Sequence, residues 1–423
     1  MENSNVKFRL IVLSFLQFAV WGAYLTSMGR YLAAAGMAEN IGWFYAMQGV
    51  VSIFMPALVG IVADRWIPAQ KVLSLCHGLA GAAMLAAGMY GLSTAAPEFT
   101  TLFTLYSISV AFFMPTIALT NSVAYTALSN AGLDTVKHFP PIRVFGTIGF
   151  ICAMLLTDGL GFQANAKQLI FSGAIGLVFC LYALTLPNCP VNRSSDRKSL
   201  VQTLGLDAFK LFKERKMAIF FIFSMLLGVS LQITNGFANP FLGSFEAIEE
   251  YASTFGVQHS NMLISLSQVS ETLCILLIPY CLKKFGIKKV MLMAMLAWVF
   301  RFGLFGVGNP GGGVWMFILS MIVYGVAFDF FNVSGSLYVD QETKPEIRSS
   351  AQGLFMMMTN GFGATIGTLS AQAVVNACVN SKPAGLAQVE GWSDAWLIFA
   401  AYALVVAILF ALIFKYKHQP NKA

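Results

Sequence analysis

The sequence predicts an all-α polytopic membrane protein with twelve transmembrane helices in two six-helix halves. Three observations predict this fold class. The chain of 423 residues is 57% hydrophobic and only 11% charged, whereas about a quarter of the residues in a soluble domain are charged. Apolar runs of about 20 residues, the length that crosses a bilayer as a helix, recur along the whole chain. One long polar interval divides these runs into two sets of six.

The same composition excludes several classes of protein. The 26 basic and 19 acidic side chains are too few to cover a soluble surface of this size, so a cytosolic enzyme and a nucleic-acid binder are excluded despite the net charge of +7. The runs are continuously apolar rather than alternating, which argues against a β-barrel. The seven cysteines form no CxxC pair and mostly lie inside apolar runs. No nucleotide-binding loop, nucleophile elbow or metal-ligand helix is present, so we expect no enzymatic activity and no cofactor.

The twelve spans are bounded by charges or by Gly and Pro. The first run follows Lys7 and Arg9 and continues past Trp21 without a small-residue cleavage site, so we interpret it as a retained span rather than a signal peptide. The predicted spans are 8–29, 42–63, 70–92, 99–125, 141–161, 168–187, 217–243, 258–281, 288–308, 313–337, 349–376 and 393–414. They define an N-terminal half at 1–187, a cytoplasmic central loop at 188–216 and a C-terminal half at 217–423.

The distribution of Lys and Arg predicts the orientation, because basic residues concentrate in cytoplasmic loops. With the N-terminus inside, 22 of the 26 basic residues fall on the cytoplasmic side. Three fall outside, namely Arg30, Lys167 and Lys382, and Arg301 lies within the ninth span. We therefore expect both termini to be cytoplasmic, in a protein that crosses the lipid bilayer many times.

Weak sequence echoes relate the two halves. The segment 64–71 follows the second span and 283–289 follows the eighth, and both carry basic residues. Likewise, Pro141-Ile142-Arg143 opens the fifth span and Glu346-Ile347-Arg348 precedes the eleventh. Each pair is six spans apart. This spacing is typical of parallel repeats related by an axis along the membrane normal, as in the major facilitator fold.

Three ionisable residues interrupt the apolar spans. Glu271 lies twelve residues before Lys283, or about 18 Å from the cytoplasmic boundary along a helix, and Asp329 lies at a similar depth. Such residues usually face a bundle interior and serve transport, so both carboxyls are candidates for proton coupling. A structural ion pair or an interhelical hydrogen bond is the alternative for Glu271, and a gate or hydrogen bond for Asp329. Arg301 is interpreted as a snorkelling or structural partner.

Uncharged polar and aromatic residues form a second set of candidates. The seventh span carries Gln232 and Asn235 three residues apart, and Gln268 lies one turn before Glu271. Amides suit a neutral, polyhydroxylated or heterocyclic ligand, and aromatic faces suit a planar ring. The remaining candidates lie on the fifth and tenth spans, and each stripe has helix packing as its alternative: Arg143, Thr147, Phe150, Tyr324 and Phe328.

Other features have structural interpretations. Pro56, Pro115 and Pro279 fall inside the second, fourth and eighth spans and favour kinks. Gly363 and Gly367 have the small-xxx-small spacing that allows helices to approach closely. The histidines His77, His138, His259 and His418 are scattered, mostly near span boundaries, and predict no metal site.

Long strings throughout the chain resemble the bacterial nucleoside permeases, the nucleoside:proton symporter family of the major facilitator superfamily. They include LSFLQFAVWGAYLTSMGRY, HFPPIRVFGTIGFI, MAIFFIFSMLLGVSLQITN, ISLSQVSETLCILLIP and SMIVYGVAFDFFNVSGS. The resemblance implies that the substrate-binding residues are Arg143, Thr147, Phe150, Gln232, Asn235, Gln268, Glu271, Tyr324 and Phe328, and that Glu271 and Asp329 couple transport to protons. One departure from the family pattern borders this set, because Gly236 stands where a bulkier residue is expected.

The resulting hypothesis is import of nucleosides with protons by alternating access. Its partners are nucleosides, protons and the lipid bilayer, with no nucleic acid, and the protein is expected to function as a monomer. A proton- or sodium-coupled sugar carrier is the alternative within transport. A non-transporting membrane sensor on the same fold is a further alternative, although a sensor usually carries an appended soluble domain.

Overall fold

The computed structural model describes residues 2–189, 191, 206–344 and 347–416, and every regular element within them is a helix. The predicted central loop at 188–216 lies partly outside these residues. Glu346, which belongs to one of the sequence similarities between the halves, and His418 also lie outside them. The fold class predicted from the sequence is confirmed.

Contacts along the backbone separate the chain into two compact units. Unit 1 comprises Met1–Asn40 and Val50–Leu204, and unit 2 comprises Ile41–Gly49 and Gly205–Ala423. The first turns of α3 (Ile41–Arg65) therefore pack with the C-terminal part of the chain, and the rest of that helix packs with the N-terminal part. Hydrophobic patterning alone gives no sign of this division, because the apolar run continues unbroken through Gly49 and Val50.

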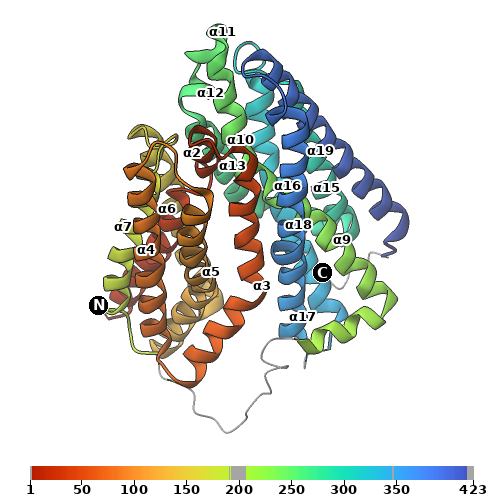
Figure 1. Cartoon of the computed structure of the whole chain (residues 1–423). Helices are drawn as coiled ribbons and strands as arrows, with labels where there is room; N and C mark the ends of the chain where they lie inside the picture. The colour runs from red at the N-terminus through yellow and green to blue at the C-terminus, as the bar shows by residue number, and fades with distance from the viewer. Residues whose placement is uncertain (1, 190, 192–205, 345–346, 417–423) are drawn as a thin grey trace. The chain divides into compact units, whose positions relative to one another are not determined.

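Unit 1 is drawn from red to yellow-green in Figure 1. Besides α3, its helices are α1 (Glu2–Gly22), α2 (Met28–Ala34), the short 3₁₀ turn η1 (Ala38–Asn40), α4 (Ala69–Ser93), α5 (Phe99–Asn130), α6 (Thr135–Gly159) and α7 (Lys167–Ala183). The most extensive packing is of α4 on α7 and on α5, and of α1 on α6.

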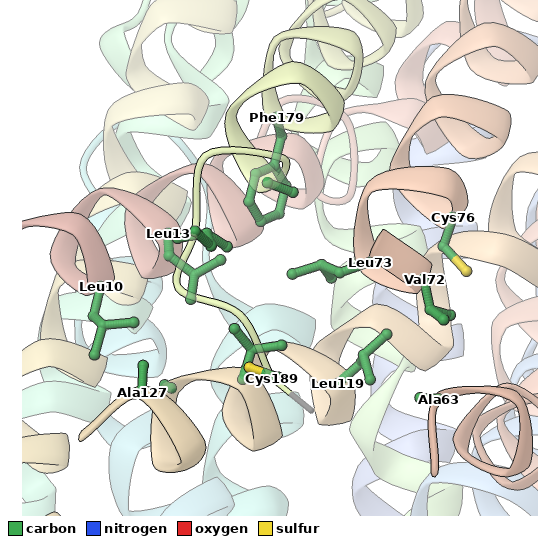
Figure 2. Packing of buried hydrophobic residues seen from close by; sticks show 14 of the residues in the cluster. Leu10, Leu13, Ala63, Val72, Leu73, Cys76, Leu119, Ala127, Phe179 and Cys189 are labelled. Atoms are coloured by element: carbon green, nitrogen blue, oxygen red, sulfur yellow. The ribbon is translucent and has the colours of Figure 1, made fainter. Parts of the chain in front are cut away.

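An apolar cluster fixes the packing of unit 1. Figure 2 shows side chains from α1, α4, α5 and α7 converging on one another, with Phe179 and Leu13 among the fully buried ones. Cys189, which follows α7, is buried in the same cluster. Because lipid tails are as apolar as these side chains, close packing rather than transfer from water holds such helices together.

Apart from the first turns of α3, unit 2 starts with the 3₁₀ helix η2 (Leu206–Lys213) and runs from green to blue in Figure 1. Its remaining elements are α9 (Arg215–Leu231), α10 (Ile233–Ser244), η3 (Phe245–Ala247), α11 (Glu249–Ala252), α12 (Phe255–Gln258), α13 (Ser260–Cys274), η4 (Ile275–Leu277), α14 (Ile278–Phe285), α15 (Ile287–Val307), α16 (Val314–Glu342), α17 (Arg348–Met356), η5 (Met357–Gly363), α18 (Ala364–Val375), η6 (Asn376–Asn380) and α19 (Leu386–Ile413). Here α15 packs on α16 and α19, and α13 packs on α16.

Each predicted span overlaps one or more helices. Within the described residues, ten helical segments are long and apolar enough to cross a membrane. The two other predicted spans fall on α1 and on α7, which has 17 residues. The multi-pass architecture expected from the apolar runs is therefore present.

The first predicted span is wrong in one respect, because residues 8–29 do not form one helix. The helix α1 ends at Gly22, and a turn separates it from α2. Side chains from elsewhere in unit 1 hold this turn: Thr157 Oγ1 donates to the Ala23 carbonyl at 2.9 Å, and Ser27 Oγ donates to Gln168 Oε1 at 2.9 Å. These partners are distant in sequence and leave no local signal.

Three other spans are interrupted. The seventh breaks at Gln232 between α9 and α10, and the eighth changes to 3₁₀ geometry at η4, just before Pro279. Proline lacks the N–H that would continue the α-helical ladder, which explains the second break. The eleventh contains the π-helical segment η5, and a second one, η6, begins at its last residue. In contrast, α3 and α5 stay helical through Pro56 and Pro115.

Candidate functional site

The fifth-span candidates lie on α6 in unit 1, where they face α1. The Arg143 guanidinium lies 3.9 Å from the centre of the Phe18 ring, a cation–π contact. The Phe150 ring is buried and meets Trp21 edge-on, with centroids 6.3 Å apart. Thr147 lies between them in sequence and is half-buried. The predicted stripe therefore faces neighbouring aromatic rings of α1.

Two glycines allow α1 and α6 to come this close. A Cβ on Gly22 would strike the backbone of Phe150, and a Cβ on Gly149 would strike the backbone of Phe15. Because backbone atoms cannot rotate away as a side chain can, these contacts fix the distance between the helices. The position of Phe150 thus depends on the absence of side chains at neighbouring positions.

The seventh-span amides lie together at the start of α10. Asn235 Nδ2 donates a hydrogen bond of 2.9 Å to Gln232 Oε1, which shows that the two side chains share a face. Both residues are half-buried. Gly236, where the family pattern suggests a larger residue, lies under a ring: a Cβ there would be 3.2 Å from Tyr45 Cδ2. The glycine makes room for Tyr45, which is buried.

The eighth-span candidates Gln268 and Glu271 lie one turn apart on α13, and both are half-buried. A buried amide pair connects α13 to α10, because Asn239 Nδ2 donates to Asn261 Oδ1 at 3.0 Å. This bond fixes the helix that carries Gln232 and Asn235 relative to the helix that carries Gln268 and Glu271.

The tenth-span candidates form one group on α16. The rings of Tyr324 and Phe328 are stacked, with centroids 5.6 Å apart and planes inclined by 14°. Asp329 follows immediately and is 5% exposed, and its Oδ2 has no hydrogen-bond partner in the described part of the chain. The Glu271 carboxyl is close enough to interact electrostatically with both Tyr324 and Asp329. The two predicted coupling acids therefore belong to one cluster.

Close packing of α13 on α16 brings these acids together. Ser270, next to Glu271, donates a hydrogen bond to the Ile322 carbonyl of α16. Opposite Ser270, Gly325 leaves no room for a side chain. A Cβ there would be 2.5 Å from the backbone carbonyl oxygen of Ser270 and 2.7 Å from Cys274 Sγ. The spacing of Glu271 and Asp329 thus depends on a glycine and a serine.

Arg301 is not a snorkelling residue, contrary to one of the two interpretations made from the sequence. It lies on α15 with only 2% of its surface exposed, among the largest fully buried side chains of the described chain. Its guanidinium contacts α16 and α13 rather than a membrane boundary. A position thirteen residues beyond Lys288 in sequence gives no indication of which way the side chain points.

A buried network in unit 1 was not recognised in the sequence. His77 is fully buried on α4, and its Nε2 lies 2.8 Å from Gln17 Oε1. Gln17 also accepts from Thr120 Oγ1 at 2.9 Å and donates to Thr116 Oγ1 at 2.8 Å. A small cavity lined by His77 and Ser109 adjoins the network. The polar residues on α1 and α5 are the signal that could have revealed it.

The close approach predicted for Gly363 and Gly367 is confirmed. A Cβ on Gly363 would be 2.5 Å from the Met225 carbonyl, and a Cβ on Gly367 would strike Val229. Both contacts join the eleventh span to α9.

The sequence profile of the family described as Nucleoside H+ symporter matches residues 4–419. The chain belongs to this family. It is 46% identical over 417 residues to the nucleoside permease NupG of Escherichia coli (strain K12), an alignment that covers 98% of this chain and 97% of that protein. It is also 46% identical over 424 residues to the xanthosine permease of the same organism, covering 99% and 98%.

A solved structure has the same fold. The crystal structure of the nucleoside transporter NupG superimposes with a TM-score of 0.89 at 46% identity, covering 98% of this chain and 100% of that one. Together with the apolar helices, this family membership identifies the protein as a multi-pass transporter of the bacterial inner membrane.

Proposed function

We propose that the protein imports nucleosides together with protons, with Glu271 as the residue that exchanges the proton. One observation carries the assignment of residues. Two carboxyl groups that interact electrostatically, Glu271 and Asp329, lie beside the stacked rings of Tyr324 and Phe328. This arrangement supports the proposal, because carboxyl groups that can bind protons lie in the same cluster of unit 2 as aromatic rings that can stack on a planar base.

The amides supply the polar recognition in this proposal. Gln232, Asn235 and Gln268 offer both donors and acceptors, which suits ribose hydroxyls and the edges of a base. The mutual bond of Gln232 and Asn235 holds the pair in one orientation while leaving each amide with unused donor or acceptor atoms. Half-burial of all three side chains leaves part of each accessible to a ligand.

Arg143, Thr147 and Phe150 of unit 1 are also proposed to bind the nucleoside. Phe150 is the alternative to Phe328 as the ring that stacks on the base, and Arg143 and Thr147 supply polar contacts. The contacts with α1 support this role, because they hold Arg143 and Phe150 in defined positions before any ligand binds.

Both termini are cytoplasmic in this proposal, and the monomer is the transporting form. Transport involves no catalytic step.

The proton supplies the driving force. Each charge that crosses the membrane contributes about 2.3 kcal/mol per 100 mV. One proton per nucleoside at 100 mV therefore sustains an accumulation of about 50-fold for a neutral solute. Glu271 binds its proton from the outer side and releases it to the inner side as the transporter alternates.

Uptake of labelled uridine into proteoliposomes with an imposed pH gradient tests the proposed function. We expect uridine to accumulate above its equilibrium level, a protonophore to abolish the accumulation, and unlabelled nucleosides but not hexoses to compete. Inhibition by hexoses instead would support the sugar carrier. Uptake that ignores the gradient would refute symport.

The two acids are distinguished by a matched pair of variants. Glu271→Gln is expected to lose gradient-driven accumulation but to keep exchange of internal for external uridine, which needs no net proton movement. Asp329→Asn is expected to retain accumulation at a reduced rate. The reverse pattern would assign proton exchange to Asp329.

A further inference from the structure

Arg301 is a buried cation that the proposed function leaves without a role. It lies on α15, and its Nη1 donates to the Ser320 carbonyl at 2.8 Å and lies 3.4 Å from Ser267 Oγ. In return, Ser320 Oγ donates to the Arg301 carbonyl at 2.9 Å. These bonds join α15 to α16 and α13, and the two contacts of Nη1 hold the guanidinium in place.

The partner of the cationic charge is an aromatic ring. Arg301 Cζ lies 4.6 Å from the centre of the Tyr324 ring and 5.5 Å from that of Phe305. Among the described residues, no carboxylate forms an ion pair with this guanidinium. A desolvated cation over a ring is held more strongly than an exposed one, so the position of Tyr324 is tied to that of Arg301.

A second residue of α15 holds the same ring. Trp298, one turn before Arg301, meets Tyr324 edge-on with centroids 6.0 Å apart. Tyr324 is 6% exposed, whereas its stacking partner Phe328 is only half-buried. The guanidinium, the Tyr324 ring and the Phe328 ring thus form a connected series that runs from the interior of unit 2 to a partly accessible aromatic face.

We propose that Arg301 is a positioning residue that acts through Tyr324 to hold the Phe328 ring in the orientation that stacks on the base of the nucleoside. The inference rests on the proposed function and deepens it, because it gives a role to a buried cation that the proposed function leaves unassigned. Arg301 itself does not touch the substrate. Its planar guanidinium is required, because an ammonium group cannot lie flat over a ring while it donates to Ser320 and Ser267.

A thermodynamic cycle on uridine affinity tests this role. The dissociation constant is measured by calorimetry for the full chain in detergent and for Arg301→Met, Phe328→Leu and the double variant. Loss of a base–ring stack weakens binding by about tenfold, and we expect each single variant to show this loss. The double variant is expected to bind no more weakly than either single one, because both changes remove the same stack.

Two further variants separate positioning from a purely structural role. Ser320→Ala removes the return bond to α15 but leaves the guanidinium over Tyr324, so we expect a lower melting temperature with uridine affinity unchanged within about twofold. Phe300→Leu serves as the matched control, because Phe300 lies next to Arg301 on α15 and its side chain is 62% exposed. Arg301→Lys keeps the charge and is expected to recover only part of the affinity. It also replaces Arg301→Met in the cycle if that variant does not fold.

Additive losses in the double variant, or unchanged affinity in Arg301→Met, would overturn the inference. Failure of the unsubstituted protein to bind uridine would instead refute the proposed function. The two failures are therefore distinguishable in the same set of titrations.

Discussion

The contact of α13 with α16 at Gly325 gives a prediction whose magnitude follows from the structure. In Gly325→Ala the new Cβ would be 2.5 Å from the backbone carbonyl oxygen of Ser270. This distance is 0.9 Å shorter than the 3.4 Å at which ordinary van der Waals contact begins. The obstruction is backbone, so the helices must separate. Overpacking of this kind costs about 1–3 kcal/mol. The separation also moves Glu271 away from Asp329, so both stability and transport should fall.

Gly303→Ala is the matched control, because a Cβ at Gly303 on α15 meets nothing within 4 Å. Replacing glycine by alanine inside a helix favours the helix by up to about 1 kcal/mol, and this gain is common to both variants. The difference between them therefore isolates the steric cost. Thermal unfolding in detergent should give a lower melting temperature for Gly325→Ala than for Gly303→Ala.

Initial rates of uridine uptake by the same two variants test the functional consequence. Displacements of about 1 Å at a site that requires defined geometry reduce rates by up to ~100-fold. We expect a large loss in Gly325→Ala and none in Gly303→Ala. Equal stability and equal uptake in the two variants would refute the argument that this glycine sets the spacing of the acids.

Three other predictions follow from individual contacts. Gln17→Leu should lower the melting temperature, because each partner left unsatisfied in the buried network of unit 1 costs about 1–3 kcal/mol; an unchanged melting temperature would contradict this. Asn235→Leu removes the donor to Gln232 and should raise the KM for uridine uptake more than it lowers the maximal rate. Burial raises the pKa of the Cys189 thiol, so less of it is thiolate at neutral pH. Because the thiolate is the reactive form, alkylation of Cys189 by N-ethylmaleimide should be slow at neutral pH and faster only at higher pH. Gln70→Ala should accelerate that alkylation, because Gln70 Oε1 accepts from the Cys189 N–H at 3.0 Å; mass spectrometry of the modified peptide gives both rates.

Hydropathy predicted the position and order of the apolar helical segments, because the bilayer imposes a length and a composition on each span. The interruptions were harder to predict. Pro279 marks the break in the eighth span through its missing N–H, but the break at Gln232 has no such residue nearby in sequence. The turn after α1 is held by Thr157 and Gln168, which are distant in the chain. Local patterns carry no information about such partners.

The relative placement of candidate residues was predictable where spacing along one helix decides it. Gln232 and Asn235 share a face because they lie three residues apart, and their hydrogen bond agrees with that expectation. The relation of Glu271 to Asp329 depends on how two helices pack, which one sequence does not specify. The direction of Arg301 and the burial of His77 were unpredictable for the same reason, since both are determined by neighbouring helices.

Recording the electrical current that a uridine concentration jump produces in proteoliposomes on a solid-supported membrane tests the central claim most directly. Uridine is neutral, so any sustained current reports the coupled proton. We predict a uridine-dependent current in the direction of proton entry, its loss in Glu271→Gln, and its persistence in the control variant Phe300→Leu. Uridine uptake without current in the unsubstituted protein, or an undiminished current in Glu271→Gln, would contradict proton coupling through this residue.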